Sequence, residues 1–178
     1  MEALIILDML NDFVDGPLAS GREKRIIPGI KKLSLAFRSK GMPVIFSSDS
    51  HLAGIDKELS VWGNHAIKGT DGAEVISELK PEESDFVIPK RRYSGFFGTD
   101  LDLLLRELGV TGIVLTGLHA NLCVRHTAAD AYFLGYRITI PKNCVEALSQ
   151  KEYEDGLQYL KRYYGATVVE TLGVENVI

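Results

Sequence analysis

Short apolar runs alternate with longer amphipathic segments along the whole chain. Most of these runs are rich in Ile and Val and have polar residues only at their ends. They cover residues 3–7, 43–47, 85–88, 112–116, 137–140 and 166–169. A short continuous apolar run is typical of a strand that is buried on both faces of a parallel sheet. The pattern therefore predicts about six parallel strands.

Apolar residues repeat at helical spacing in four of the segments between these runs. The segments are 30–40, 101–108, 121–134 and 151–164, and a glycine follows each of them, as is common at helix ends. The alternation of strands and helices predicts an α/β fold, a three-layer doubly wound sheet of about six parallel strands. Because parallel connections are right-handed, helices should cover both faces of this sheet.

Composition narrows the class of protein. With 178 residues, 46% of them hydrophobic, the chain is long enough for a single domain over residues 1–178 with a sizeable core. The net charge is −4 and no dense basic run occurs, which argues against a nucleic-acid partner. No glycine-rich dinucleotide or nucleotide motif is present either.

Cysteine content and the N-terminus indicate the compartment. Two cysteines are too few for a disulfide framework, so we expect a reducing environment. The first apolar run stops early and has no basic stretch before it, unlike a signal peptide. No apolar stretch approaches the roughly 20 residues that cross a bilayer. We therefore expect a cytoplasmic protein with no membrane partner.

Four chemically unusual residues lie at the ends of the predicted strands. Asp8 ends the first strand, Asp49 follows the second, Lys90 follows the third, and Cys123 lies just beyond the fourth. Sites in an open parallel sheet form at the carboxyl ends of its strands. We therefore expect these four side chains to meet.

Cys123 lies where a predicted strand turns into a predicted helix. Free N–H groups and the positive end of the helix dipole favour the thiolate, which is the reactive form of a thiol. The same turn, from His119 to Cys123, can offer N–H groups to the oxyanion that forms when a carbonyl is attacked. The alternative is a cysteine that packs as a small hydrophobe. That alternative is our interpretation of Cys144.

Asp8 and Lys90 are the candidate partners of this thiol. A carboxylate that closes a fully apolar strand is costly unless it is paired, and near a thiol it can accept and return a proton. The ammonium of Lys90 can stabilise the thiolate and keep the carboxylate ionised. The alternatives are a helix cap or a structural ion pair for Asp8, and an ordinary surface position for Lys90.

A second set of residues has the composition of a metal site. Asp49 and His51 are two residues apart at a strand end, and His65 closes the segment 62–65. One carboxylate and two imidazoles form a plausible set of ligands for Zn²⁺, with positions left for water or substrate. An Asp-x-His pair is also common by chance, so the spacing alone leaves both interpretations open.

Three motifs together resemble the isochorismatase-like cysteine hydrolases, which include nicotinamidases and N-carbamoylsarcosine amidases. They are residues 8–13 (DMLNDF), Lys90 with residues 93–96 (YSGF), and residues 117–124 (GLHANLCV), and they occur in the family's order. The resemblance implies a catalytic triad of Cys123, Asp8 and Lys90 on a six-stranded parallel sheet. It also implies a cis peptide at Leu118–His119 and a homo-oligomer, either a dimer or a tetramer.

The resemblance extends to the metal residues, because metal-dependent nicotinamidases carry an Asp-x-His followed by a Trp-x-x-His at these places. It implies a divalent metal, with zinc favoured, on Asp49, His51 and His65. Trp62 and Phe13 then line the substrate pocket, although plain packing is the alternative for both. No role is assigned to His126, three residues after Cys123, and no organic cofactor is expected.

Two residues depart from the family pattern. Leu10 stands where Gln is frequent, and His119 stands beside the expected oxyanion hole, where a small residue is usual. We expect His119 to face the substrate.

These features predict an enzyme that hydrolyses a small amide through a thioester and releases ammonia, with nicotinamide as the first candidate substrate. An N-carbamoyl amino acid such as N-carbamoylsarcosine is the second candidate. Two other classes remain open, a hydrolase that uses metal-bound water and a metabolite-binding protein without catalysis.

Overall fold

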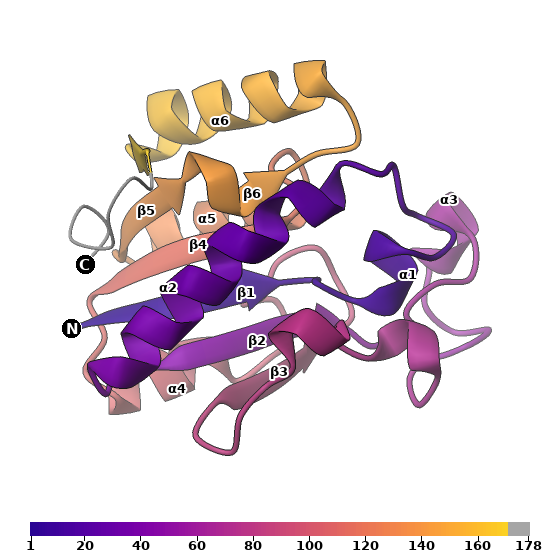
Figure 1. Cartoon of the computed structure of the whole chain (residues 1–178), viewed down its shortest axis with the longest axis horizontal. Coiled ribbons are helices and arrows are strands. Elements are labelled where there is room, and N and C mark those ends of the chain that lie inside the picture. Colours follow the sequence, from indigo (N-terminus) through magenta and orange to yellow (C-terminus); the bar gives the residue numbers. More distant parts are fainter. Residues whose placement is uncertain (171–178) are drawn as a thin grey trace.

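A parallel sheet forms the centre of the protein, described here for residues 1–170 of a computed structural model (Figure 1). Within these residues the strand order is β3-β2-β1-β4-β5-β7, and a short β6 pairs with the end of β4. The strands are β1 (Glu2–Leu7), β2 (Val44–Asp49), β3 (Phe86–Lys90), β4 (Gly112–Leu118), β5 (Arg137–Pro141), β6 (Val145–Glu146) and β7 (Thr167–Val169). The last eight residues of the domain predicted for 1–178 lie outside the described part.

Helices cover both faces of the sheet. Figure 1 shows α2 crossing in front of the strands, with α4 and α5 behind them. The α-helices are α1 (Asn11–Val14), α2 (Ile27–Ser39), α3 (Leu59–Trp62), α4 (Leu101–Glu107), α5 (Cys123–Phe133) and α6 (Gln150–Tyr164). Four 3-10 turns are η1 (Glu23–Ile26), η2 (Asp71–Ala73), η3 (Ser77–Leu79) and η4 (Lys142–Cys144). None of the helices in the described residues is long and apolar enough to span a membrane.

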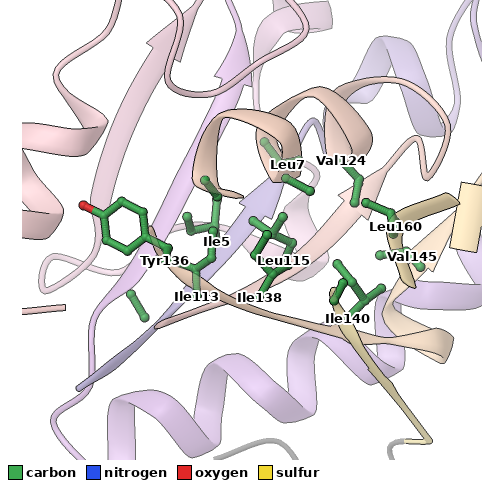
Figure 2. Close-up of a cluster of buried hydrophobic side chains, with 14 of the residues drawn as sticks. Ile5, Leu7, Ile113, Leu115, Val124, Tyr136, Ile138, Ile140, Val145 and Leu160 are labelled. Atoms are coloured by element: carbon green, nitrogen blue, oxygen red, sulfur yellow. The ribbon is translucent and has the colours of Figure 1, made fainter. Parts of the chain in front are cut away.

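The side chains of the buried strands alternate between two cores. On β1, Ile5 and Leu7 join the core under α4, α5 and α6, whereas Leu4 and Ile6 join the core under α2. Figure 2 shows the first of these cores, in which Ile5 and Leu7 meet residues of β4, β5 and α5. Burial on both faces explains why the strand sequences are continuous apolar runs.

The predicted α/β architecture is confirmed, with differences at the ends of elements. The prediction missed β6 and the short helices α1 and α3 because they lack a periodic pattern long enough to detect. The predicted helix 121–134 begins only at Cys123. Strand β3 continues through Pro89 to Lys90, which is possible because β3 is an edge strand of the sheet and proline needs no ladder partner there.

One glycine brings the ends of β1 and β4 together. Gly117 is paired with Leu7, and a Cβ at this position would collide with the carbonyl of Leu7. Its φ of +96° also lies in the region that favours glycine. The close approach of these two strand ends places the residue after β1 next to the turn that leads into α5.

Candidate active site

The four chemically unusual residues meet at the carboxyl edge of the sheet. Asp49 and Lys90 are paired in register at the ends of β2 and β3. Asp8 directly follows β1, and Cys123 is the first residue of α5. All four are buried, with at most 3% of any of them exposed. The spatial cluster that the strand ends predicted is therefore present.

The ammonium of Lys90 connects the other three side chains. Its Nζ lies 2.8 Å from Oδ2 of Asp8, 2.5 Å from Oδ1 of Asp49 and 3.6 Å from Sγ of Cys123. The backbone N–H of Asp49 donates to Oδ1 of Asp8 over 2.8 Å. Asp8 has a φ of +53°, which is uncommon for a residue other than glycine and frequent at functional sites.

Burial and charge set the protonation states in this cluster. Burial and the nearby Asp49 raise the pKa of Asp8 to about 6, against the lowering effect of Lys90. Burial lowers the pKa of Lys90, but the carboxylates of Asp49 and Asp8 outweigh it and hold that pKa well above its usual value. At neutral pH the pair is therefore an ammonium beside a carboxylate that is close to accepting a proton.

The thiol of Cys123 differs from the expectation. The position at a helix start predicts a thiolate, but burial raises the pKa of Cys123 well above its usual value, and Lys90 does not outweigh burial and the two carboxylates. A helix start and a neighbouring ammonium both favour the thiolate. Complete burial next to Asp8 and Asp49 is a property of the folded chain, and it favours the neutral thiol in the free protein.

The turn between β4 and α5 surrounds the thiol with backbone groups. The peptide bond Leu118–His119 is cis, as the resemblance implied. Two N–H groups of the turn have backbone acceptors, since Ala120 donates to Glu146 and Leu122 donates to His119. The N–H of Cys123 opens a helix and so has no acceptor within it.

Four side chains on the other side of Asp49 form a group with the spacing of metal ligands. Ligand atoms of Asp49, His51, Glu58 and His65 all lie within 4.8 Å of one another, and all four residues are buried. Nε2 of His51 and Oε2 of Glu58 have no hydrogen-bond partner among the described residues. Nδ1 of His65 donates to the carbonyl of Gly63 over 2.8 Å, which leaves Nε2 with its lone pair.

This donor set fits a divalent metal such as zinc, because imidazole nitrogens and carboxylate oxygens converge on one buried point with unsatisfied atoms. The three predicted residues are brought together, and Glu58 is the member that sequence analysis missed. Glu58 belongs to no recognisable motif. The only available signal was its place just before Trp62 in the long irregular segment.

A buried carboxylate orients one member of this group. Oδ2 of Asp56 lies 3.1 Å from Nδ1 of His51 and also accepts from the N–H of Leu52 over 3.0 Å. Arg91 binds both oxygens of Asp56, with Nε 2.9 Å from Oδ1, and holds the pKa of Asp56 well below its usual value. The lowered pKa keeps Asp56 ionised at neutral pH, where it accepts the hydrogen on Nδ1 of His51, so that Nε2 of His51 faces the other ligands.

A pocket opens over the thiol and this group. It is lined by Phe13, Leu18, Asp49, Glu58, Trp62, His65, Tyr93, His119, Leu122, Cys123 and Leu148. Each predicted pocket residue therefore lines it. Nε1 of Trp62 donates to the hydroxyl of Tyr93 over 2.9 Å, which fixes the indole. The ring of Phe13 contacts the rings of His65 and His119, with centroids 5.7 Å and 5.9 Å away.

Three residues that the sequence singled out lie elsewhere. His126 points back along its helix, where Nδ1 lies 2.8 Å from the carbonyl of Leu122. Cys144 and Leu10 are both fully buried in the core under α2. None of the three lines the pocket, so the departure at Leu10 concerns packing and the departure at His119 concerns the site.

A buried cysteine, carboxylate and ammonium at the edge of a doubly wound sheet are typical of a hydrolase. Comparison with known proteins supports the same class of protein. The chain matches the isochorismatase domain over residues 2–172 and belongs to the isochorismatase family. N-carbamoylsarcosine amidase from Thermoplasma acidophilum is 42% identical, with a TM-score of 0.91 and 98% of each chain covered.

Two further solved structures are similar. Nicotinamidase PncA from Bacillus subtilis is 38% identical with a TM-score of 0.89, and the match covers 95% of this chain and 99% of that chain. A pyrazinamidase of Pyrococcus horikoshii in complex with zinc is 31% identical with a TM-score of 0.88, covering 95% of this chain and 98% of that chain. The chain is an isochorismatase-family hydrolase whose structural neighbours include amidohydrolases.

Proposed function

We propose that this protein is a cysteine-dependent amidohydrolase that cleaves a small amide through a thioester and releases ammonia. The observation that carries the proposal is the position of Lys90, whose Nζ lies 2.8 Å from Asp8 and 3.6 Å from the thiol of Cys123. The three side chains supply a nucleophile, a base and a fixed positive charge in one buried site.

The first half of the reaction forms the thioester. The carboxylate of Asp8 takes the proton of the Cys123 thiol as Sγ attacks the carbonyl carbon of the amide. The ammonium of Lys90 stabilises the developing thiolate, and the N–H groups of His119 and Cys123 receive the oxyanion. The tetrahedral intermediate then collapses, the C–N bond breaks, and the Asp8 carboxylic acid gives its proton to the leaving ammonia.

The second half of the reaction consumes one water. The Asp8 carboxylate takes a proton from water as the oxygen adds to the thioester carbon. The C–S bond breaks, the thiolate recovers its proton from Asp8, and the carboxylic acid leaves. The sum is one amide and one water converted into one acid and one ammonia. A pKa of about 6 suits Asp8 for this exchange, because a base titrating near neutral pH can both accept and return a proton.

A divalent metal, with zinc favoured, belongs to this proposal. Asp49, His51, Glu58 and His65 would hold it, and the zinc complex of the similar pyrazinamidase supports the choice of ion. When bound there, the ion would act as a Lewis acid that can hold the ring nitrogen of a heteroaromatic amide. The chain's own contribution is to keep that substrate between Trp62 and Phe13, with its carbonyl over Cys123.

Nicotinamide is the proposed substrate. None of the described residues that line the pocket is a Lys or an Arg, so no side chain there would pair with a free carboxylate on the substrate. The aromatic side chains of Phe13, Trp62 and Tyr93 offer flat apolar surface to a ring. N-carbamoylsarcosine is the second candidate, supported by the 42% identity with the Thermoplasma acidophilum enzyme.

Ammonia release tests both candidates. Purified protein loaded with zinc should release ammonia from nicotinamide and pyrazinamide, and more slowly from N-carbamoylsarcosine. The reverse order would make the carbamoyl compound the substrate class. Absence of ammonia from all three would reject the amidohydrolase proposal.

The mechanism has its own test. Cys123→Ala should abolish turnover, with Cys144→Ala as the matched control that retains it. If Cys123→Ala keeps its activity while a chelator removes it, metal-bound water is the nucleophile. A protein that only binds metabolites would show no faster labelling of Cys123 than of Cys144 by iodoacetamide.

A further inference from the structure

Asp12 belongs to the first of the three sequence motifs, yet it is neither a member of the proposed triad nor part of the pocket lining. Its Oδ2 accepts a hydrogen bond over 2.8 Å from the main-chain N–H of Ala66. Ala66 directly follows His65, which is one of the candidate metal ligands. The carboxylate of Asp12 therefore holds the peptide unit that joins His65 to Ala66.

The main chain of Ala66 connects the two candidate histidine ligands. Ala66 follows His65 in the sequence, and its carbonyl accepts a hydrogen bond over 2.9 Å from the N–H of His51. The carbonyl of His51 in turn accepts one over 2.9 Å from the N–H of Lys68. One short stretch of main chain therefore sets the positions of two candidate ligands that lie far apart in the sequence, and Asp12 is bonded to that stretch.

The conformation of Ala66 needs this support. Its φ is +43°, and among the described residues Asp8 is the only other non-glycine residue with a positive φ. Residues with a side chain rarely adopt this conformation, which persists where the surrounding structure imposes it. Ala66 is also fully buried, so its N–H depends on the Asp12 carboxylate for a hydrogen-bond partner.

The carboxylate of Asp12 is itself held in place by the turn η2. In the preceding residue of α1, the N–H of Asn11 donates to the carbonyl of Glu74 over 3.0 Å, and Nδ2 of Asn11 donates to the carbonyl of Asp71 over 2.9 Å. A Cβ at Gly72 would lie 2.2–2.4 Å from the carboxylate atoms of Asp12. Gly72 therefore leaves the space that this carboxylate occupies.

We propose that Asp12 is a positioning residue for the metal site, because its hydrogen bond to Ala66 fixes the main chain between His51 and His65. The inference rests on the metal of the proposed function, since it concerns how the same ion would be held. Asp12 is not one of the candidate ligands and does not line the pocket, so it acts through Ala66. Loss of an outer partner of this kind commonly costs 10–100-fold in metal affinity.

The zinc affinity of the purified protein, measured by competition with a chromogenic chelator, tests this inference without turnover. Asp12→Ala removes the hydrogen-bond acceptor and should weaken zinc binding by roughly 10–100-fold. Asp12→Asn keeps an oxygen acceptor in the same place and should recover most of the lost affinity. Asp15→Ala is the matched control, because it removes the charge of a mostly exposed carboxylate next to α1, which pairs with Lys24, and it should leave the affinity unchanged.

Gly72→Ala tests the same hydrogen bond with Asp12 intact. The new Cβ would displace the carboxylate of Asp12, so zinc affinity should fall as it does in Asp12→Ala. Gly72 does not have a positive φ, so alanine fits its backbone conformation. Thermal unfolding without zinc shows whether each variant is folded. If Asp12→Ala is not, Gly72→Ala takes its place in the comparison.

Three results overturn the inference. They are a folded Asp12→Ala or Gly72→Ala protein that binds zinc as tightly as the unmodified protein, equal losses of affinity in Asp12→Ala and Asp15→Ala, and an unmodified protein that binds no zinc. Failure of the proposed hydrolysis is a different outcome. In that case the unmodified protein releases no ammonia from any candidate amide, whereas the zinc affinities are compared without substrate.

Discussion

Asp49 and Lys90 form a buried ion pair that joins the two halves of the candidate site. Oδ1 of Asp49 lies 2.5 Å from Nζ of Lys90, while Oδ2 lies 3.6 Å from Nε2 of His51. The same carboxylate therefore contacts both the proposed triad and the proposed metal ligands. Its charge affects the ionisation of one set and the ligand strength of the other, and this double role leads to the first two predictions.

The activity of the protein should fall as the pH drops through about 6. Asp8 must be ionised to take the proton of Cys123, and its pKa is raised to about 6 by burial and by Asp49. The active, ionised form is therefore fully populated well above this pH and is lost below it. A profile of kcat/KM between pH 3.5 and 8 measures this acidic limb, whose midpoint belongs to the coupled cluster as a whole. A limb near pH 4 would contradict the raised pKa.

Asp49→Asn should shift that limb to lower pH, because the Asp49 charge is one of the causes that raise the pKa of Asp8. The substitution should also lower the affinity for zinc. Even at saturating zinc, kcat/KM should stay at least roughly tenfold below that of the unmodified protein, because the substitution breaks the buried ion pair with Lys90, which is costly. His65→Ala is the matched control, which loses zinc affinity but keeps the position of the limb. If the acidic limb has the same midpoint in both variants, the charge of Asp49 does not affect the pKa of Asp8.

Arg91→Ala should weaken zinc binding without touching a ligand. Arg91 holds Asp56 ionised, and Asp56 fixes the ring of His51 through its Nδ1. Loss of such an outer partner commonly costs 10–100-fold in metal affinity. Zinc competition with a chromogenic chelator gives the value. Arg106→Ala is the control, because this half-exposed arginine pairs with Asp102 within α4. An unchanged zinc affinity in Arg91→Ala would show that Arg91 does not help to orient His51 for metal binding.

Gly117→Ala should destabilise the protein far more than Gly135→Ala. Both glycines have positive φ, +96° and +85°, so both substitutions carry the cost of that conformation, about 1–2 kcal/mol. Only at Gly117 does the new Cβ meet backbone, the carbonyl of Leu7. Urea unfolding measures the difference, which we expect to exceed about 2 kcal/mol. Similar losses for the two variants would show that β1 and β4 can separate without penalty.

Much of the fold follows from local sequence. Continuous apolar runs predict strands buried on both faces, and β1 and β4 are such runs. Helix ends are also local, as at Gly165, which closes α6 in the left-handed conformation. The elements that escaped prediction, β6, α1 and α3, have two, four and four residues. Segments of that length carry no periodicity, and only their contacts with the rest of the chain define them.

Some residues of the candidate site can likewise be predicted from the sequence, and others cannot. Asp8, Lys90 and Cys123 could be selected from the sequence because parallel strands end at one edge, so residues at strand ends must converge. Glu58 could not be selected, since its proximity to His51 depends on how the long segment after β2 folds back. The strand ends predict that Asp49 and Lys90 converge, but their ion pair depends on side-chain geometry that the sequence does not show.

The sequence alone therefore determined the architecture, the edge of the sheet that holds the site, and the chemical groups available there. Only the tertiary structure decided their ionisation. Burial of Cys123 between two carboxylates raises its pKa, where the helix start by itself predicted the opposite. The reason is physical: hydrophobic periodicity is a local property of the chain, whereas desolvation and charge interactions depend on which distant residues surround a group.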